Sequence, residues 1–391
     1  MSNTPSAGIA PQLAQHEIKQ RSPNLEDLWH SRGRAEYTAA VEDRLDVSVM
    51  HEPFTQLVVL NGDLVSGYDT IANNVTRYLD QAFAPIRGHG LPWAVTYGNH
   101  DNERFSKSRD LLEYERMTYP DHSLTKNMGP RGREAGVSNY YLEVLPAETS
   151  DVPALLLWFF DSRGGAEPHD WVDDSVVQWF VEANADLVGK YNQVVPSLAF
   201  FHIPITAAYD FQIESGVDAS REPGNDGEKV WWQGRGYDGK TGHDVKFMSA
   251  LSSTEGMLAT FSGHDHDNDW CFKWRSPGTG SSSAGLNVCY GRHTGYGGYG
   301  DLPRGARQIM LKHSTLTEEV MTWIRLEDGG VPENVTLNAT YGQDEYHPHS
   351  VLERIDPKRS MGINYDINQG IQLRVSTLYL LTLALLWWTA S

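Results

Sequence analysis

Four short polar clusters carry residue types that commonly hold metal ions in proteins. In chain order these are Gly62-Asp63, Gly98-Asn99-His100-Asp101, His202 and Gly263-His264-Asp265-His266. A two-metal centre for hydrolysis needs a carboxylate that bridges two ions about 3.5–4 Å apart, with neutral ligands completing each coordination sphere. Asp63 suits the bridge. Carboxylate, amide and imidazole ligands suit Mn, Fe, Zn or Mg without selecting among them, so the pattern predicts two divalent metal ions.

The remaining polar residues divide into two groups around this bridge. Asn99, through its amide oxygen, would complete one ion together with His202 and His264, while His266 would reach the other. His100 is then available as a general acid for a leaving oxygen, or to stabilise charge on a phosphate. Asp101 is placed to fix the tautomer of the His100 ring. The chemistry predicted is attack of a metal-bridging hydroxide on a phosphate ester.

Each cluster alone has an ordinary structural explanation, because Gly-Asp is common in turns and a lone histidine is often a core residue. Their position in the chain favours a site. Each follows a short apolar run of the kind typical of strands buried on both faces. The runs are 57–60, 93–97, 155–160, 197–201 and 257–261. Parallel sheets bind ligands at the carboxyl ends of their strands, so the clusters are expected along one sheet edge.

Helical patterns separate the apolar runs, one over 75–86 before Gly88 and Gly90, and another beginning after Asp173-Asp174. Alternating strands and helices predict an α/β fold. Segments 307–312 and 319–326 are expected to be closing strands. Residues 204–242 have little periodicity and predict a long insertion loop. Within it, Trp231 and Trp232 could contact a substrate, although a small core inside the loop is the favoured interpretation.

Taken together, these segments resemble the calcineurin-like phosphoesterases and, within them, the fungal branch related to purple acid phosphatases. The resemblance covers residues 22–328 and is carried by LVVLNGDLVSG (57–67), LPWAVTYGNHD (91–101), WFFDSRGG (158–165), SLAFFHIPI (197–205), FSGHDHDNDWCFKW (261–274) and NVCYGRHTGYGGYG (287–300). It implies two packed mixed β-sheets flanked by helices and metal-dependent phosphate ester hydrolysis. It also implies that Asp63 bridges the ions, that Asn99, His202 and His264 bind the second ion, that His266 binds the first, and that His100 is the acid.

Two departures from the family pattern bear on the first ion. Purple acid phosphatases carry a tyrosine three residues after the bridging aspartate, where this chain has Ser66, so their tyrosine–iron colour should be absent. The family also opens with a strand ending in Asp-x-His, and no such triplet precedes Asp63; residues 27–30, DLWH, have the wrong spacing. One hypothesis is that residues 1–21 are not the native start and the first strand is missing. Its rival is a degenerate protein that binds one metal weakly.

The ends and the charge of the chain suggest where it acts. The formal charge of −19 argues against a nucleic-acid partner. Residues 375–390 are apolar and uncharged, which predicts a membrane anchor, a cleaved lipid-anchor signal or a docked terminal helix. Three Asn-x-Thr triplets, at 74, 334 and 338, favour glycosylation and a secretory route to the cell surface or membrane. Cys271 and Cys289 are compatible with a disulfide or with two buried thiols.

The sequence therefore predicts four regions: a non-family N-terminus (1–21), a phosphoesterase domain (22–328), a polar linker (329–372) and a hydrophobic tail (373–391). The expected function is phosphate monoester hydrolysis, with phosphoproteins among the candidate substrates. The alternatives are a phosphodiesterase acting on nucleotides or lipids, and a metal-binding protein without activity. Arg292 and His293 could line the phosphate pocket, or belong to a plain glycine-rich turn.

Overall fold

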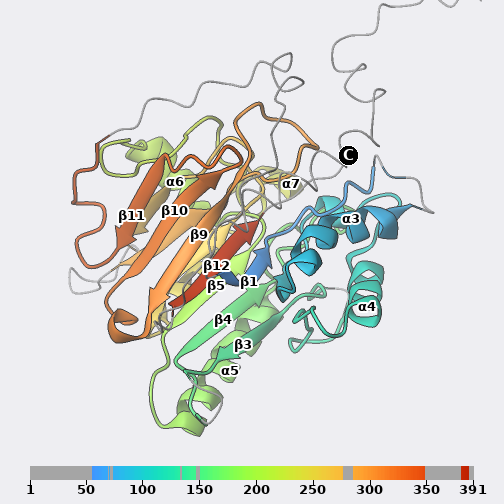
Figure 1. Ribbon diagram of the computed structural model, residues 1–391, viewed down its shortest axis with the longest axis horizontal. Helices are drawn as coiled ribbons and strands as arrows, with labels where there is room; N and C mark the ends of the chain where they lie inside the picture. The colour runs from blue at the N-terminus through green and yellow to red at the C-terminus, as the bar shows by residue number, and fades with distance from the viewer. Residues whose placement is uncertain are drawn as a thin grey trace, which may run out of the picture.

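Two six-stranded β-sheets form the body of the protein (Figure 1). The computed structural model describes residues 55–68, 70, 74–132, 134–146, 150–275, 285–347 and 380–386. The first sheet has the order β11 (Glu333–Leu337), β10 (Val320–Leu326), β9 (Gly305–Lys312), β12 (Leu380–Leu386), β1 (Thr55–Leu60) and β2 (Trp93–Val95). The second has the order β3 (Tyr140–Val144), β4 (Leu155–Phe160), β5 (Ser197–Phe201), β6 (Met257–Ser262), β8 (Leu286–Tyr290) and β7 (Cys271–Trp274).

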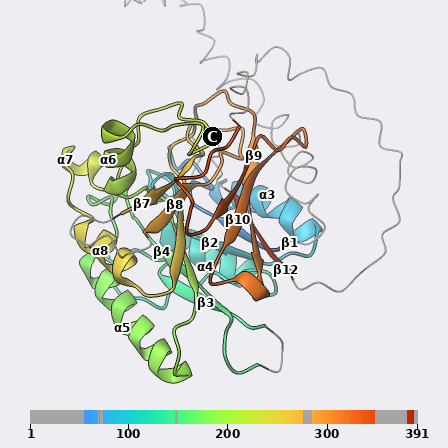
Figure 2. The same cartoon turned by 90° about the vertical axis from the view of Figure 1, so that its left-hand side faces the viewer.

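The sheets pack face to face, and helices cover their outer faces (Figure 2). In β1, Leu57 and Val59 enter the core between the sheets, whereas Val58 and Leu60 pack outward, as strand alternation requires. The outward residues contact α3 (Val75–Gly88) and α4 (Ser108–Thr118). On the other side, α5 (Asp174–Tyr191), α6 (Thr206–Glu214) and α8 (Val245–Ser253) contribute to the core that covers the second sheet. The predicted fold of two packed sheets flanked by helices is confirmed.

Parallel pairing brings the polar clusters to one edge. Strand β1 pairs in parallel with β2, and β4, β5, β6 and β8 are parallel neighbours in turn. Carboxyl ends of parallel strands lie at the same edge of a sheet, so the loops after β1 and β2 are neighbours, and so are the loops after β5 and β6. Contacts of His202 with Asp63 and Asn99 join the two pairs of loops. The predicted strands at 57–60, 155–160, 197–201 and 257–261 are all confirmed, and β2 ends two residues before the predicted position.

Two segments contain more regular structure than the sequence predicted. Residues 333–337, inside the predicted polar linker, pair antiparallel with β10 and extend the first sheet as β11. Residues 204–242 include α6 and the short helix α7 (Arg235–Asp238). The sequence pattern did not predict these elements, because β11 is only five residues long and the helices of the loop are short.

The apolar C-terminal segment also differs from expectation. Its residues 380–386 form β12, a central strand that pairs in parallel with β1 and antiparallel with β9 (Figure 1). The docked-helix interpretation is therefore wrong for these residues. No helix within the described ranges is long and apolar enough to cross a membrane, and membrane association through 375–390 stays a prediction. Residues 1–21 and the rest of the tail lie outside the described residues.

Cys271 and Cys289 lie opposite each other on β7 and β8 and form a disulfide. Of the two interpretations that the sequence left open, the bridge is the one observed. Both cysteines are buried in the core between the sheets. The bridge therefore joins the strand that follows the loop of Gly263–His266 to the strand that precedes the glycine-rich loop 291–300.

Candidate metal centre and substrate pocket

Four side chains from different loops converge at the predicted sheet edge. Nε2 of His202 lies 3.0 Å from Asp63 Oδ2, 3.1 Å from Asn99 Oδ1 and 3.2 Å from His264 Nδ1. One ligand atom each from Asp63, His202 and His264 lies within 4.8 Å of the other two. Asp63 and His202 are almost fully buried, so these groups have little access to bulk water.

The hydrogen bond on the far side of the His202 ring shows why the cluster suits a cation. Nδ1 of His202 lies 2.8 Å from the backbone oxygen of Asn61, which can only accept, so Nδ1 carries the proton. In the neutral ring Nε2 then presents a lone pair to the oxygens of Asp63 and Asn99. Lone pairs that face each other at about 3 Å repel, whereas a divalent ion between them would be coordinated by all of them. The residues fit a metal ion.

Backbone conformation and glycine make this close approach possible. Asp63 (φ 55°) and His264 (φ 77°) both adopt the left-handed region, which non-glycine residues rarely occupy and which is typical of functional sites. A side chain at Gly62 would collide with the His202 ring, and one at Gly98 would collide with the Asp63 carboxylate. The glycines in the two motifs are therefore explained by packing against ligands.

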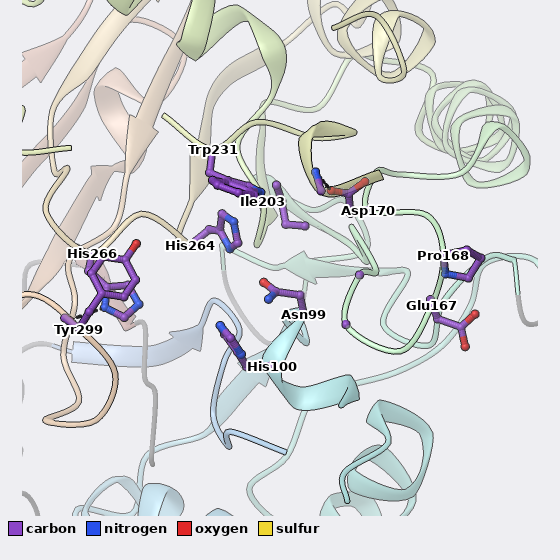
Figure 3. A pocket seen from close by; sticks show the side chains of 13 residues that line it. Asn99, His100, Glu167, Pro168, Asp170, Ile203, Trp231, His264, His266 and Tyr299 are labelled. Atoms are coloured by element: carbon purple, nitrogen blue, oxygen red, sulfur yellow. Dashed lines mark hydrogen bonds between the residues drawn. The ribbon is translucent and has the colours of Figure 1, made fainter. Parts of the chain in front are cut away.

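His266 lies apart from this group. Figure 3 shows it beside Tyr299 at the left of the view, apart from Asn99 and His264 in the middle. Its Nδ1 lies 2.6 Å from the Tyr299 backbone oxygen, and its ring stacks on that of Tyr299 at 3.8 Å. Burial lowers the pKa of His266 to about 3, which keeps the ring neutral and able to bind a metal. Within the described ranges, the grouped metal-ligating residues do not include it.

His100 faces the pocket and is held by Glu103. Its Nδ1 lies 2.7 Å from Glu103 Oε1, which leaves Nε2 for a substrate. Burial lowers the pKa of His100, but the Asp63 and Glu103 carboxylates outweigh it and raise the pKa to about 9. Asp101 was predicted to orient this ring. Its carboxylate accepts hydrogen bonds from the backbone of Val65 and Gly98, at 2.9 and 2.8 Å, and so connects the loop after β1 to the loop after β2.

The convergent ligands border a cavity of about 370 Å³. Its lining residues are Asn99, His100, Gly164, Gly165, Glu167, Pro168, Asp170, Ile203, Trp231, Gly236, His264, His266 and Tyr299. The two neighbouring tryptophans of the insertion were predicted either to contact substrate or to form a small core, and they differ in this respect. Trp231 is 43% exposed and lines the cavity, whereas Trp232 is buried and stacks on Tyr209 at 3.9 Å. The preference for a small core holds for Trp232 and is wrong for Trp231.

Arg292 does not line the cavity. Its guanidinium is buried, forms an ion pair with Asp269 and donates to the backbone oxygen of Pro303. His293 is also buried, and its ring packs on that of His266 at 4.0 Å. Within the described residues, Arg292 therefore lies outside the lining of this cavity, and His293 lies next to it through its contact with His266.

Sequence reasoning missed Glu103, Asp170 and Tyr299. Glu103 stands three residues after His100, a spacing at which side chains meet on one helical turn, and that signal was available. Asp170 and Tyr299 reach the cavity from irregular loops. No periodic pattern marks either residue in the sequence.

A family model described as calcineurin-like phosphoesterase matches residues 29–268. A protein of Arabidopsis thaliana named "Probable inactive purple acid phosphatase 29" is 26% identical over 298 residues, which are 70% of each chain. "Phosphatase DCR2" of Saccharomyces cerevisiae is 29% identical over 310 residues, 72% of this chain and 49% of that protein. The crystal structure of a dimetal phosphatase from Danio rerio aligns with a TM-score of 0.46 and 15% identity, covering 79% of this chain and 90% of that one.

Proposed function

The chain belongs to the calcineurin-like phosphoesterase family, and from that premise we propose that it hydrolyses phosphate monoesters. The observation that carries this proposal is the convergence of Asp63, Asn99, His202 and His264 beside an open cavity. A divalent ion held there would supply the Lewis acidity that phosphoryl transfer to water requires. Asp63 would contribute the negative charge that binds the ion, and the neutral ligands would fix its position.

His100 is the candidate general acid. Its ring lines the cavity next to Asn99, so it faces an ester whose phosphate lies at the metal ligands. The hydrogen bond between Nδ1 and Glu103 holds the ring with Nε2 toward the leaving oxygen. A proton delivered from Nε2 would neutralise that oxygen as the ester bond breaks. No side chain needs to form a covalent intermediate in this scheme.

A second candidate is a metal-binding protein without turnover. Besides the bridging Asp63, the first metal ion has a single predicted ligand, His266. In the described part of the chain, His266 lines the cavity but lies apart from the grouped ligands. In addition, one similar plant protein is named as probably inactive. A single ion without a second ion opposite it would bind phosphate but could leave attack by water slow.

Phosphate release from p-nitrophenyl phosphate, after loading with Mn or Zn, separates the two functions. The hydrolase predicts activity that a chelator removes and that is lost in Asp63→Asn. If the metal-loaded protein binds phosphate but releases no product, the chain is a metal-binding protein without turnover.

A further inference from the structure

The cavity beside the metal ligands has two chemically different ends (Figure 3). Asn99, His100 and His264 lie at one end, where a phosphate would bind. Glu167 and Asp170 lie toward the other, whereas Trp231 lies beside His264 in this view and its Nε1 approaches Gly236, which contacts Asp170. No lysine or arginine is among the cavity-lining residues in the described part of the chain. A group bound at this second end would meet carboxylates and an aromatic ring.

Asp170 has an unused acceptor at this end. The residue is 8% exposed, and its Oδ2 accepts a hydrogen bond from the Gly236 backbone at 2.6 Å. Its Oδ1 is buried and has no hydrogen-bond partner among the described residues. A buried carboxylate oxygen left without a donor is costly, so a ligand that brings a donor would be stabilised there.

Trp231 adds an aromatic surface beside this carboxylate. Its ring is 43% exposed, and its backbone is held by a hydrogen bond of 3.1 Å to Asp265. The Arg235 guanidinium lies 4.2 Å from the ring centroid and covers one face of the indole, so a second cation would use the other face. Aromatic faces attract ammonium groups in the same way. The Asp170 carboxylate, with its buried free acceptor Oδ1, and the Trp231 indole together are complementary to a cation with N–H donors.

We propose that this end of the cavity binds the ammonium group of the leaving alcohol, so that the preferred substrates are phosphate monoesters of primary amino alcohols. This inference rests on the proposed function and names its substrate class. In the reaction, the oxygen of water bonds to phosphorus, the bond between phosphorus and the ester oxygen breaks, and the departing amino alcohol takes up a proton. The ammonium group is unchanged, and it orients the ester oxygen toward His100.

O-phosphoethanolamine and n-propyl phosphate are matched probes, because the second has a methyl group where the first has the ammonium group. We expect metal-loaded wild type to bind O-phosphoethanolamine about 10- to 100-fold more tightly in calorimetry, as expected of a buried hydrogen bond to a charged group. The ratio of kcat/KM for O-phosphoethanolamine to kcat/KM for n-propyl phosphate should fall by a similar factor in Asp170→Asn, which replaces one carboxylate oxygen with an amide NH₂ group. Glu113→Gln, an exposed carboxylate on α4 outside the cavity, should keep the preference.

The outcomes separate the inference from the proposed function. If neither ester is hydrolysed, the proposed function fails. Tighter binding of O-phosphoethanolamine by wild type would still support the ammonium site. If wild type binds both esters equally, the ammonium site is overturned whatever the turnover. An unchanged preference in folded Asp170→Asn would overturn it as well.

Discussion

The two sides of the candidate metal centre are built in different ways. On one side Asp63, Asn99, His202 and His264 follow β1, β2, β5 and β6, which are two pairs of parallel neighbours, one pair in each sheet. On the other side His266 depends on contacts with Tyr299 and His293, which belong to the glycine-rich loop after β8. The first side is produced by sheet topology, and the second by loop packing.

The strand beside β1 also distinguishes the two sides of the metal centre. Strand β12 is parallel to β1 and ends at the same edge of the first sheet, with Leu386 opposite Leu60. Its sequence, LLTLALL, contains no carboxylate, imidazole or amide side chain. Within the described residues, this strand therefore offers a second ion none of the ligand types that follow β1, β2, β5 and β6. The comparison therefore predicts one strong metal site and one weak one.

Removing the negative charge of Asp63 from the strong metal site should reduce metal affinity and activity more than any other change. In Asp63→Asn we expect metal affinity and kcat/KM each to fall by more than about 100-fold, because losing even an indirect contact to a ligand costs about 10- to 100-fold. Metal titration by calorimetry and phosphate release from p-nitrophenyl phosphate measure the two effects. A variant that retains wild-type affinity for Mn would break the comparison, because the strong site would then lie elsewhere.

Substituting one histidine on each side compares the sides directly. His264→Ala should weaken the tightest ion by more than about 100-fold, whereas His266→Ala should change its affinity by less than about tenfold. Elemental analysis after gel filtration should find one tightly retained ion per wild-type chain. Two retained ions, with equal losses in the two variants, would show that the sides are equivalent.

The same contrast explains how much could be predicted from the sequence. Ligands that follow buried parallel strands were found, since an apolar run such as 197–201 marks its own end and His202 comes next. The two-sheet fold and the helices α3 and α5 were predicted by the same periodicity. In these cases local pattern and tertiary position agree.

Residues placed by tertiary packing alone were not predictable. Asp170 and Trp231 meet in the cavity because Gly236 of the insertion donates to the Asp170 carboxylate, a contact between residues 66 positions apart. Arg292 looked like a phosphate ligand, but its ion pair with Asp269 commits it to the core. The apolar run 380–386 suits a membrane, a helix or a central strand, and only its pairing with β1 and β9 distinguishes them.

Glu103 tests whether the strong side acts as a unit with the general acid. In Glu103→Gln we expect kcat to fall about 10- to 100-fold, because the amide holds the His100 ring less firmly and no longer favours its protonated form. Metal affinity should stay unchanged, since Glu103 does not contact the grouped ligands. Glu113→Gln is the matched control on α4. Loss of metal binding in Glu103→Gln would mean that the acid and the metal ligands cannot be separated.

Asp265 is expected to change stability rather than turnover, and it tests the connection between the two sides because it lies between His264 and His266 in the chain. Burial and the Glu228 carboxylate raise its pKa to about 8 from an ordinary 3.8. Between these values the folded protein keeps a proton that the unfolded chain has released, so the free energy of unfolding falls as pH rises toward 8. Asp265→Asn removes this titration. In chelator, urea unfolding should show the variant gaining stability relative to wild type from pH 5 to pH 8.5. Parallel pH profiles would mean that Asp265 is ionised in the fold, and that an anion joins the two sides after all.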